Sequence, residues 1–262
     1  MYQEERLMAI LRYLEQHERI GVQDIVEQFK VSRDTARRDI LKLEEQGSIV
    51  RTCGGAILPG SARQIRSYQE RLQLESEGKR AIGMLGARFI QDRESVMMDA
   101  STTVRFAAEK MESKDNVVIT NSIDIATVLA DKGNVSVKLL GGDLDLENRY
   151  VYGPRAVQML SDFHVNKLFI GACGITVHGL FSWSEEDGLI LREMMRRADA
   201  IYVLADHSKF GVQLLYRVAG LERIDVVITD EEPAEEIQDA LRANNVDWIQ
   251  ATKHLAKEDA TE

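Results

Sequence analysis

Four basic side chains recur along one short stretch of the sequence, at Arg33, Arg37, Arg38 and Lys42. Arg33 and Arg37 are four residues apart, as are Arg38 and Lys42, so on a helix each pair lies on one outer surface. Such groups contact DNA phosphates, and guanidinium groups also read base edges in the major groove. A solvated charged face is the commoner explanation for a single helix of this kind, so the neighbouring segments are needed to choose between the two.

The residues around these basic positions predict a helix. Ser32 can cap its start with the hydroxyl oxygen, and Asp34 lies in the first turn, where the helix dipole favours a negative charge. Apolar residues recur at spacings of four and three, which makes one inward stripe of Ala36, Ile40 and Leu43. The segment therefore predicts a helix with a thin apolar side and a basic outer side.

The flanking segments extend this helix into a larger motif. Residues 22–29 form a short amphipathic pattern, and a turn of two residues, Lys30 and Val31, joins them to Ser32. Gly47 suits the residue after the helix end, because glycine adopts the left-handed conformation without strain. A strand over 49–52 and a bend at Gly54-Gly55 then predict a small wing. Helix, turn, basic helix and wing are the winged helix-turn-helix arrangement.

The same stretch resembles the DeoR family of bacterial transcriptional regulators. The resemblance is carried by Val31, Ser32, Thr35, Arg37, Arg38, Asp39, Leu43, Glu44, Gly47, Arg51, Gly54, Gly55 and Ala56. Two positions depart from the family pattern: Ala36 stands where isoleucine is usual, and Cys53 where the wing usually carries histidine or tyrosine. We expect contacts to double-stranded operator DNA from Ser32, Arg33, Thr35, Arg37, Arg38, Lys42 and Arg51.

The charge distribution is consistent with DNA binding by the N-terminal part alone. The chain of 262 residues has a net charge of −10. Residues 1–56 hold nine Lys/Arg and ten Asp/Glu, a net charge of −1, and the remainder has a net charge of −9. Local patches matter more than totals for phosphate contact, and the acidic remainder should repel DNA. We therefore expect the first domain to bind DNA and to be presented in duplicate by a homo-oligomer, a dimer or a tetramer.

Composition excludes several other classes of protein. The cysteines, Cys53 and Cys173, are far apart and suggest neither a disulfide framework nor a metal site, which favours a reducing cytoplasm. The N-terminus has no apolar signal core, and no apolar run approaches membrane-spanning length. His164, His178 and His207 are too far apart to predict a metal site from their spacing, and no nucleotide-binding fingerprint is present. We expect no cofactor.

The pattern of elements predicts two domains with a linker between them. A first helix over 3–17 opens a DNA-binding domain of residues 1–57, and residues 58–73, which contain Pro59-Gly60-Ser61, form the linker. A helix over roughly 74–91 opens the second domain, residues 74–254. Its strands are predicted at 95–98, 117–120, 135–140, 167–172, 201–205, 226–229 and 246–250, and its helices at 102–111, 123–131, 154–161, 187–198 and 233–244. This alternation predicts an α/β domain with a largely parallel sheet covered on both faces.

Small polar residues follow several of these strands. In parallel α/β sheets the loops at the carboxyl ends of the strands gather ligands, and hydroxyls with free amides at a helix start suit an anion. The candidates are Asp99, Ser101, Thr102 and Thr103, then Thr120, Asn121 and Ser122, then Gly142 and Gly174, and Lys209. Taken singly, each is more often a helix cap or a turn residue. Their repetition at successive strand ends favours a site for a phosphorylated, polyhydroxylated ligand.

The resemblance supports this expectation. The C-terminal half of DeoR-family regulators is similar to sugar-phosphate isomerases of the ribose-5-phosphate isomerase type and senses phosphorylated sugars or related metabolites. Ser101 replaces the usual glycine of the family, and Leu191 stands where the family often carries lysine. Trp183 with the acidic run 185–187 lies where a loop could close over a ligand, although such a run is more often solvated.

These observations predict a transcriptional regulator, a repressor of a carbohydrate catabolism operon controlled by a phosphorylated sugar. One alternative is a sugar-phosphate isomerase with an appended DNA-binding domain, and a second is a DNA-binding protein whose C-terminal domain only oligomerises. An isomerase needs a positioned base and a partner acid or cation. Asp99 could be the base, but Leu191 removes one plausible cation, so we expect no enzymatic activity.

Overall fold

The computed structural model describes residues 3–17, 19–46, 48–52, 55–57, 68–73 and 77–254. Contacts between Cα atoms divide the chain into two units, Met1–Ile65 and Arg66–Glu262. The division falls within the predicted linker, of which residues 58–67, with Pro59-Gly60-Ser61, lie outside the described part. The predicted domain boundaries at residues 57 and 74 stay predictions.

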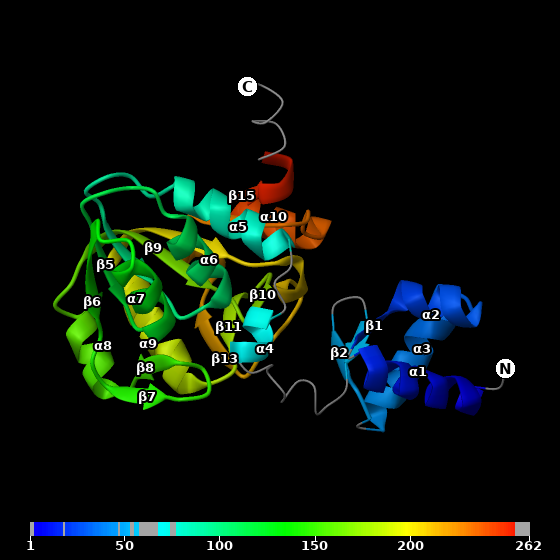
Figure 1. Ribbon diagram of the computed structural model, residues 1–262. Coiled ribbons are helices and arrows are strands. Elements are labelled where there is room, and N and C mark those ends of the chain that lie inside the picture. Colours follow the sequence, from blue (N-terminus) through cyan, green and yellow to red (C-terminus); the bar gives the residue numbers. More distant parts are fainter. Residues whose placement is uncertain are drawn as a thin grey trace. The chain divides into compact units, whose positions relative to one another are not determined.

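The first unit consists of helices packed beside a small antiparallel sheet (Figure 1). Its elements are α1 (Gln3–His17), β1 (Arg19–Gly21), α2 (Val22–Phe29), α3 (Arg33–Glu45), β2 (Val50–Thr52) and β3 (Gly55–Ile57), with the sheet order β1-β3-β2. This arrangement confirms the predicted winged helix-turn-helix. The predicted bend is partly wrong, because Gly55 is the first residue of β3, while Gly47, Cys53 and Gly54 lie outside the described residues.

The core of this unit explains why these short segments fold. Side chains from α1, α2 and α3 meet in one apolar cluster, in which Ile10 and Ile25 are fully buried. The predicted inward stripe of α3 is confirmed, since Ala36, Ile40 and Leu43 are all buried in this cluster. Burial of this one face holds α3 in place and leaves its opposite side exposed.

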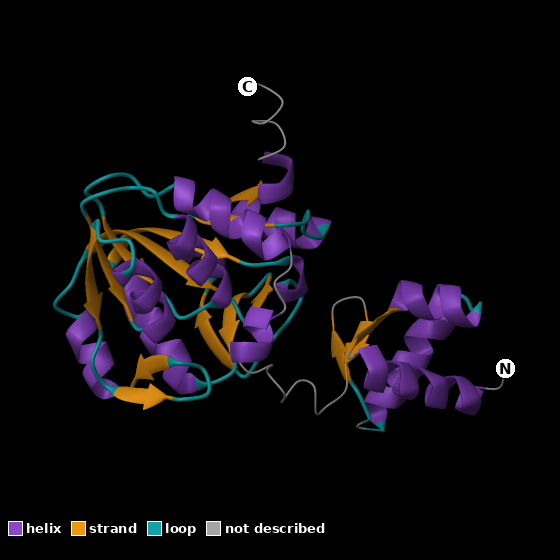
Figure 2. Ribbon diagram, viewed as in Figure 1, coloured by secondary structure: helices purple, strands orange, loops and turns teal. Residues whose placement is uncertain are grey.

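The second unit is built on a parallel sheet of seven strands with helices on both faces (Figure 2). The strands are β4 (Ser95–Met98), β5 (Asn116–Thr120), β6 (Val135–Leu139), β9 (Val165–Gly171), β12 (Ala198–Leu204), β14 (Val226–Thr229) and β15 (Asp247–Gln250). Their order is β15-β14-β12-β9-β4-β5-β6, and every neighbouring pair is parallel. The predicted parallel α/β architecture is therefore confirmed.

Alternating side chains of the strands reach two separate apolar clusters. On β4, Met97 joins one cluster, and Val96 and Met98 join the other. The first cluster contains side chains of α8 (Pro154–Leu160), α9 (Glu185–Arg196) and α10 (Glu235–Ala243), and the second those of α5 (Glu77–Arg88), α6 (Thr102–Lys110) and α7 (Ile123–Ala130). The sheet is thus covered on both faces, as its apolar strands require.

Several elements differ from the sequence prediction. Residues 68–73, expected in the linker, form the helix α4 (Tyr68–Gln73), and the helix expected over 74–91 is α5, with 74–76 outside the described residues. A helix of six residues is too short to show periodicity, and α4 is held by burial of Tyr68, which is 1% exposed. The prediction also missed the antiparallel sheet of β10 (Gly174–Thr176), β11 (Gly179–Ser182) and β13 (Tyr216–Ala219), and the hairpin of β7 (Asp143–Asp145) and β8 (Tyr150–Tyr152).

Within the described part of the chain, no helix combines the length and the apolar character that a membrane span requires.

Candidate functional site

A pocket lies where the direction of the chain through the sheet reverses. From β4 the chain continues through β5 to β6 at one edge, and from β9 through β12 and β14 to β15 at the other. β4 and β9 are neighbours at this switch point, and their carboxyl ends carry Asp99 and Gly171. Ligands of open α/β sheets bind at such a point because the loops separate there and leave a crevice.

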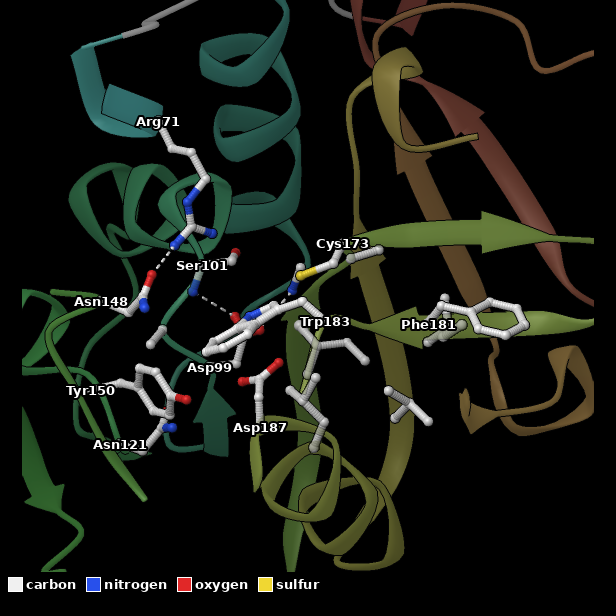
Figure 3. Close-up of a pocket in the computed structure, with 17 residues that line it drawn as sticks. Arg71, Asp99, Ser101, Asn121, Asn148, Tyr150, Cys173, Phe181, Trp183 and Asp187 are labelled. Atoms are coloured by element: carbon white, nitrogen blue, oxygen red, sulfur yellow. Dashed lines mark hydrogen bonds between the residues drawn. The ribbon is translucent and has the colours of Figure 1, made fainter. Parts of the chain in front are cut away.

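The pocket has a largely polar wall on one side (Figure 3). Its enclosed cavity has a volume of about 60 Å³. Its polar and aromatic lining residues are Arg71, Asp99, Ser101, Asn121, Asn148, Tyr150, Cys173, Phe181, Trp183 and Asp187. Burial raises the pKa of the Cys173 thiol to about 12, so this cysteine stays protonated and is not a nucleophile at neutral pH.

Asp99 is fixed by the backbone at the floor of the pocket. Its Oδ1 accepts a hydrogen bond from the Ser101 amide (3.0 Å), and its Oδ2 accepts one from the Gly171 amide (3.0 Å). Burial raises the pKa of Asp99 to about 7, the two backbone hydrogen bonds act in the opposite direction, and the nearby Asp187 carboxylate adds a smaller upward contribution. A side chain at Gly171 would lie 2.3 Å from the Ser101 Cβ, so only glycine allows this close approach of β9 to the loop after β4.

Asp187 brings a second carboxyl group to the same pocket. Ser184 caps α9 by accepting a hydrogen bond from the Asp187 amide (3.1 Å), and Ser182 donates its hydroxyl proton to Asp187 Oδ2 (2.5 Å). Burial raises the pKa of Asp187, against the hydrogen bond from Ser182 and the positive charge of Arg71. In the predicted acidic run, Glu185 and Glu186 are exposed, whereas Asp187 and the neighbouring Trp183 line the pocket.

Arg71 and Asn148 close the opposite side of the pocket. Arg71, on α4, donates from Nη2 to Asn148 Oδ1 (3.0 Å), and both residues lie beside Ser101 in Figure 3. Two buried polar atoms of the lining, Arg71 Nε and Asn121 Oδ1, have no hydrogen-bond partner among the described residues. Buried polar groups are nearly always paired, so these two atoms indicate a site completed by a ligand or by water.

The ten predicted ligand-binding residues divide into two groups. Asp99, Ser101 and Asn121 line the pocket, and the other seven do not. The seven are Thr102, Thr103, Thr120, Ser122, Gly142, Gly174 and Lys209. Sequence reasoning did not select Arg71, Asn148, Tyr150 or Cys173 as ligand-binding residues; Arg71 lies on α4 and Tyr150 on β8, two elements that it had not predicted.

Several of these seven have a structural role in the loops. The Ser122 hydroxyl caps α7 by accepting from the Ile125 amide (3.2 Å), and Thr120 Oγ1 accepts from the Ser122 amide (3.0 Å). A side chain at Gly174 would lie 2.1 Å from the Val212 carbonyl oxygen, so this glycine allows close backbone packing. These roles are the helix caps and turns that the sequence analysis named as the alternative to ligand binding.

Lys209 and the first turn of α6 are also outside the pocket wall. Lys209 ends a short 3-10 helix, His207–Lys209, capped by Asp206, and its positive charge contributes to a lowered pKa of the Asp206 carboxyl. Thr102 and Thr103 are buried at the start of α6, 4% and 6% exposed, behind Ser101, whose hydroxyl accepts from the Val104 amide (3.0 Å).

The loops near Lys209 contain one group of side chains with metal-binding potential. His207 Nδ1 lies 2.9 Å from Asp230 Oδ2 and 3.3 Å from Glu231 Oε1. The other two histidines that the sequence analysis considered, His164 and His178, do not belong to this group. The hydrogen bond between His207 and Asp230 is sufficient to explain the arrangement.

In the first unit, α3 presents three arginine side chains to solvent. Arg33, Arg37 and Arg38 are exposed, and Thr35 and Lys42 are half-buried. Lys42 Nζ donates to Gln3 Oε1 (3.3 Å). Two further positions that the sequence assigned to DNA contact remain: Ser32 caps α3 by accepting from the Thr35 amide (3.2 Å), and Arg51 lies on β2 with its side chain outside the described part.

Asp39, part of the arginine-arginine-aspartate motif, points away from this exposed surface. It is fully buried, and its carboxylate accepts hydrogen bonds from Arg6 Nε (2.5 Å) and Arg6 Nη2 (3.1 Å). Gln3 Nε2 also donates to Asp39 Oδ1 (3.0 Å). These bonds join α1 to α3, so this acid positions the basic helix.

Comparison with known proteins agrees with both units. The DeoR-like helix-turn-helix domain matches residues 6–62, and the DeoR C terminal sensor domain matches residues 74–231. The HTH-type transcriptional repressor GlcR of Bacillus subtilis is 48% identical over 249 residues, covering 95% of this chain and 96% of the relative. The glycerol-3-phosphate regulon repressor of Escherichia coli is 27% identical over 248 residues, covering 94% and 98%.

Among solved structures, ribose 5 phosphate isomerase A from Neisseria gonorrhoeae is similar at 14% identity and a TM-score of 0.38, covering 52% of this chain and 54% of that one. The full-length relatives are named as repressors, in agreement with the prediction that the chain is a regulator rather than an enzyme. The chain therefore belongs to the DeoR family of transcriptional regulators.

Proposed function

We propose that this regulator is a repressor of a carbohydrate catabolism operon, and that a phosphorylated sugar bound in the pocket at the β4–β9 switch point controls its affinity for operator DNA. It acts in the cytoplasm as a homo-oligomer, a dimer or a tetramer. The oligomer presents two or more copies of α3 to a duplex, as two-fold operators require.

The observation that carries the proposal is the composition of the pocket wall. Asp99 and Asp187 supply carboxyl oxygens that accept hydrogen bonds from sugar hydroxyls, and Arg71 supplies a cation for an acidic group. A polyhydroxylated anion uses both kinds of group at once, whereas an apolar ligand would use neither. The name of the glycerol-3-phosphate regulon repressor, which mentions a phosphate ester, is in line with this chemistry.

The residues of the proposed sites follow from exposure and from the pocket wall. For DNA they are Arg33, Arg37 and Arg38, which are exposed on α3, with Thr35 and Lys42 beside them. For the effector they are Asp99, Ser101 and Asn121 from the sequence prediction, joined by the lining residues Arg71, Asn148 and Asp187.

A panel of sugars tests the effector. Ribose 5-phosphate, glucose 6-phosphate, fructose 1-phosphate and glycerol 3-phosphate are each compared with the unphosphorylated compound in a thermal unfolding assay of the full chain. A ligand that binds only the folded protein raises the melting temperature. At 100 times its Kd it adds about 2.7 kcal/mol to the free energy of unfolding. We expect at least one phosphorylated member to stabilise the protein and its unphosphorylated counterpart to have little effect.

A second measurement connects the ligand to DNA. Duplexes that bind the protein are selected from a random-sequence pool, and their affinity is measured by fluorescence anisotropy with and without the stabilising ligand. Typical couplings of about 1–3 kcal/mol change this affinity 5- to 150-fold. A protein that binds a selected duplex but responds to no phosphorylated sugar in either assay would contradict the proposal and favour a C-terminal domain that only oligomerises.

A further inference from the structure

α4 is the first described element that follows the DNA-binding unit along the chain. Ile57 ends β3, Tyr68 begins α4, and residues 58–67 connect them. A helix of six residues has no stability of its own in water, so its position depends on the side chains that anchor it. A ligand that alters the contacts of these side chains therefore also alters the position of α4, where the linker joins the sensor unit.

Two side chains anchor α4 to the rest of this unit. Tyr68 is 1% exposed and lines a second cavity together with Arg105, Asp124 and Val128 of α6 and α7. Arg71 is the second anchor, and its side chain extends from α4 into the pocket at the β4–β9 switch point, as Figure 3 shows. Its guanidinium carbon is 5.8 Å from the centre of the Tyr68 ring, so the two anchors are also in reach of each other.

The second anchor, Arg71, has one hydrogen-bond donor without a partner among the described residues. Arg71 Nη2 donates to the neutral Asn148 Oδ1 at 3.0 Å, but the buried Nε has no hydrogen-bond partner among the described residues. A guanidinium group presents its N–H donors as a planar fork that fits two oxygens of one phosphate or carboxylate. An acidic group that enters the pocket would accept a hydrogen bond from the unpartnered Nε of this fork.

We propose that Arg71 binds the acidic group of the effector, a phosphomonoester, and that α4 thereby transmits effector binding to the DNA-binding unit. This inference rests on the proposed function, and it places the phosphate between Arg71, Asn148 and Ser101. The sequence analysis expected the phosphate at Ser101, Thr102, Thr103 and Lys209, but of these only Ser101 lines the pocket. The sugar hydroxyls then lie toward Asp99 and Asp187.

This placement explains how a small ligand bound in one unit can act on the other. A ligand shifts DNA affinity only if it binds one conformation of the protein more tightly than another. A phosphate held by both the body of the sensor unit, through Ser101 and Asn148, and α4, through Arg71, binds tightly only when α4 is docked. The bound state therefore adds the phosphate contacts to those that already hold α4. Without ligand these are the burial of Tyr68, the hydrogen bond from Arg71 to Asn148, and the one from Lys79 Nζ to the Arg71 carbonyl oxygen (3.2 Å).

The test uses the full chain and a reporter within the pocket. Trp183 lines the pocket, and Trp248 on β15 does not. In a Trp248→Phe background the fluorescence of Trp183 reports ligand binding at this site alone. The variants are Arg71→Gln, Arg71→Lys and the matched control Arg155→Gln, which removes the same charge from an exposed position of α8 outside the pocket.

The first probe is inorganic phosphate at constant ionic strength, followed by the phosphorylated sugars of the panel and their unphosphorylated counterparts. We expect Arg71→Gln to weaken binding of phosphate and of phosphorylated sugars at least tenfold, and binding of unphosphorylated sugars much less. Arg71→Lys should fall between, because lysine keeps the charge but loses the fork. Arg155→Gln should bind as the parent does. Arg71→Lys also keeps the test decisive if Arg71→Gln folds poorly.

The second readout is hydrogen exchange of the backbone amides in residues 68–73. In the parent, a saturating phosphorylated sugar should slow this exchange, and the ratio of operator affinities with and without the sugar should differ from one. In Arg71→Gln, at sugar concentrations raised to restore occupancy of the pocket, the exchange should not slow and the ratio should approach one.

The outcomes separate this inference from the proposed function. If Trp183 responds to inorganic phosphate through Arg71 but no phosphorylated sugar changes operator affinity, the anion subsite stands and the proposed function fails. If a phosphorylated sugar regulates Arg71→Gln as it does the parent, the proposed function stands and the role of Arg71 is wrong. Unchanged exchange of residues 68–73 in a parent that binds and responds to the sugar would overturn transmission through α4.

Discussion

The buried ion pair between Arg6 and Asp39 is expected to determine whether the DNA-binding unit stays folded. The two side chains are 9% and 0% exposed, and the Arg6 guanidinium contacts the carboxylate through Nε at 2.5 Å and Nη2 at 3.1 Å. The hydrogen bond that Arg6 donates to Asp39 raises the pKa of Arg6, so the arginine remains charged. Asp39→Ala would therefore leave a positive charge in the interior without its partner.

The size of this effect follows from the burial of both groups. Removing one partner of a buried pair costs about 3–5 kcal/mol, because the remaining charge has lost its solvation and gained nothing in return. Globular domains have about 0.05–0.15 kcal/mol of stability per residue, which gives about 3–10 kcal/mol for a unit of 65 residues. Asp39→Ala thus removes a third or more of the free energy of unfolding of this unit.

Hydrogen exchange followed by mass spectrometry measures this loss in the full chain, because it reports α1 and α3 separately from the second unit. We expect the opening free energy of amides in α3 to fall by about 3–5 kcal/mol. Asp34→Ala is the matched control: it removes the same charge from an exposed position in the first turn of α3 and should cost only about 0.3–1 kcal/mol.

A double replacement distinguishes the unpaired charge from lost packing. Arg6→Met with Asp39→Leu removes both charges and fills the space with apolar atoms, so it should be much less destabilising than Asp39→Ala alone. If Asp39→Ala lowers the opening free energy by less than about 1 kcal/mol, the pair does not hold α1 on α3 and the reasoning fails. If the double variant is as unstable as the single one, packing rather than charge is responsible.

Further predictions concern both units. Arg37→Ala and Arg38→Ala should each weaken a selected duplex, by about 1–3 kcal/mol where a base contact is lost, and unchanged affinity of both at matched salt would reject α3 as the reading helix. Because folded Asp99 keeps its proton up to about pH 7 and the unfolded carboxyl ionises near 3.8, the folded state binds more protons between these values. Stability of the second unit should therefore fall as pH rises through this window, by up to about 1.4 kcal/mol per pH unit, and urea titrations of Asp99→Asn should show a flatter dependence. Purified protein should not isomerise pentose or hexose phosphates, and turnover abolished by Asp99→Asn would overturn this. Gly174→Ala, whose Cβ would lie 2.1 Å from the Val212 carbonyl oxygen, should lower the melting temperature, at a cost of about 1–3 kcal/mol.

The sequence by itself determined the elements whose signals are local. The stripe of Ala36, Ile40 and Leu43 and the Ser32 cap lie within a dozen residues, and they define α3 correctly. The alternation of strands and helices likewise predicts the parallel sheet, because each strand is apolar and each connection is helical. Periodicity and capping depend on neighbours along the chain, so a sequence shows them directly.

The sequence also indicated the strand ends at which the pocket lies, but not which of their residues line it. Hydroxyl and glycine residues at a strand end suit a ligand, a helix cap or a tight turn equally, because all three use the same hydrogen bonds. Ser101 lines the pocket while also capping α6, whereas Ser122 only caps α7. Which of these residues faces the pocket depends on how each loop leaves the sheet.

Only the tertiary structure brought together residues that are far apart in the chain. The pocket forms because β4 and β9, separated along the chain by β5, β6 and the β7–β8 hairpin, become neighbours at the switch point. Asp187 reaches it from α9 and Arg71 from α4, a helix too short to be read from periodicity. Asp39 is a second example, in the first unit. Charged residues usually lie at the surface, and only the packing of α1 against α3 reveals that this acid is buried. The pairing of distant groups depends on where the backbone places them, and no spacing in the sequence records that distance.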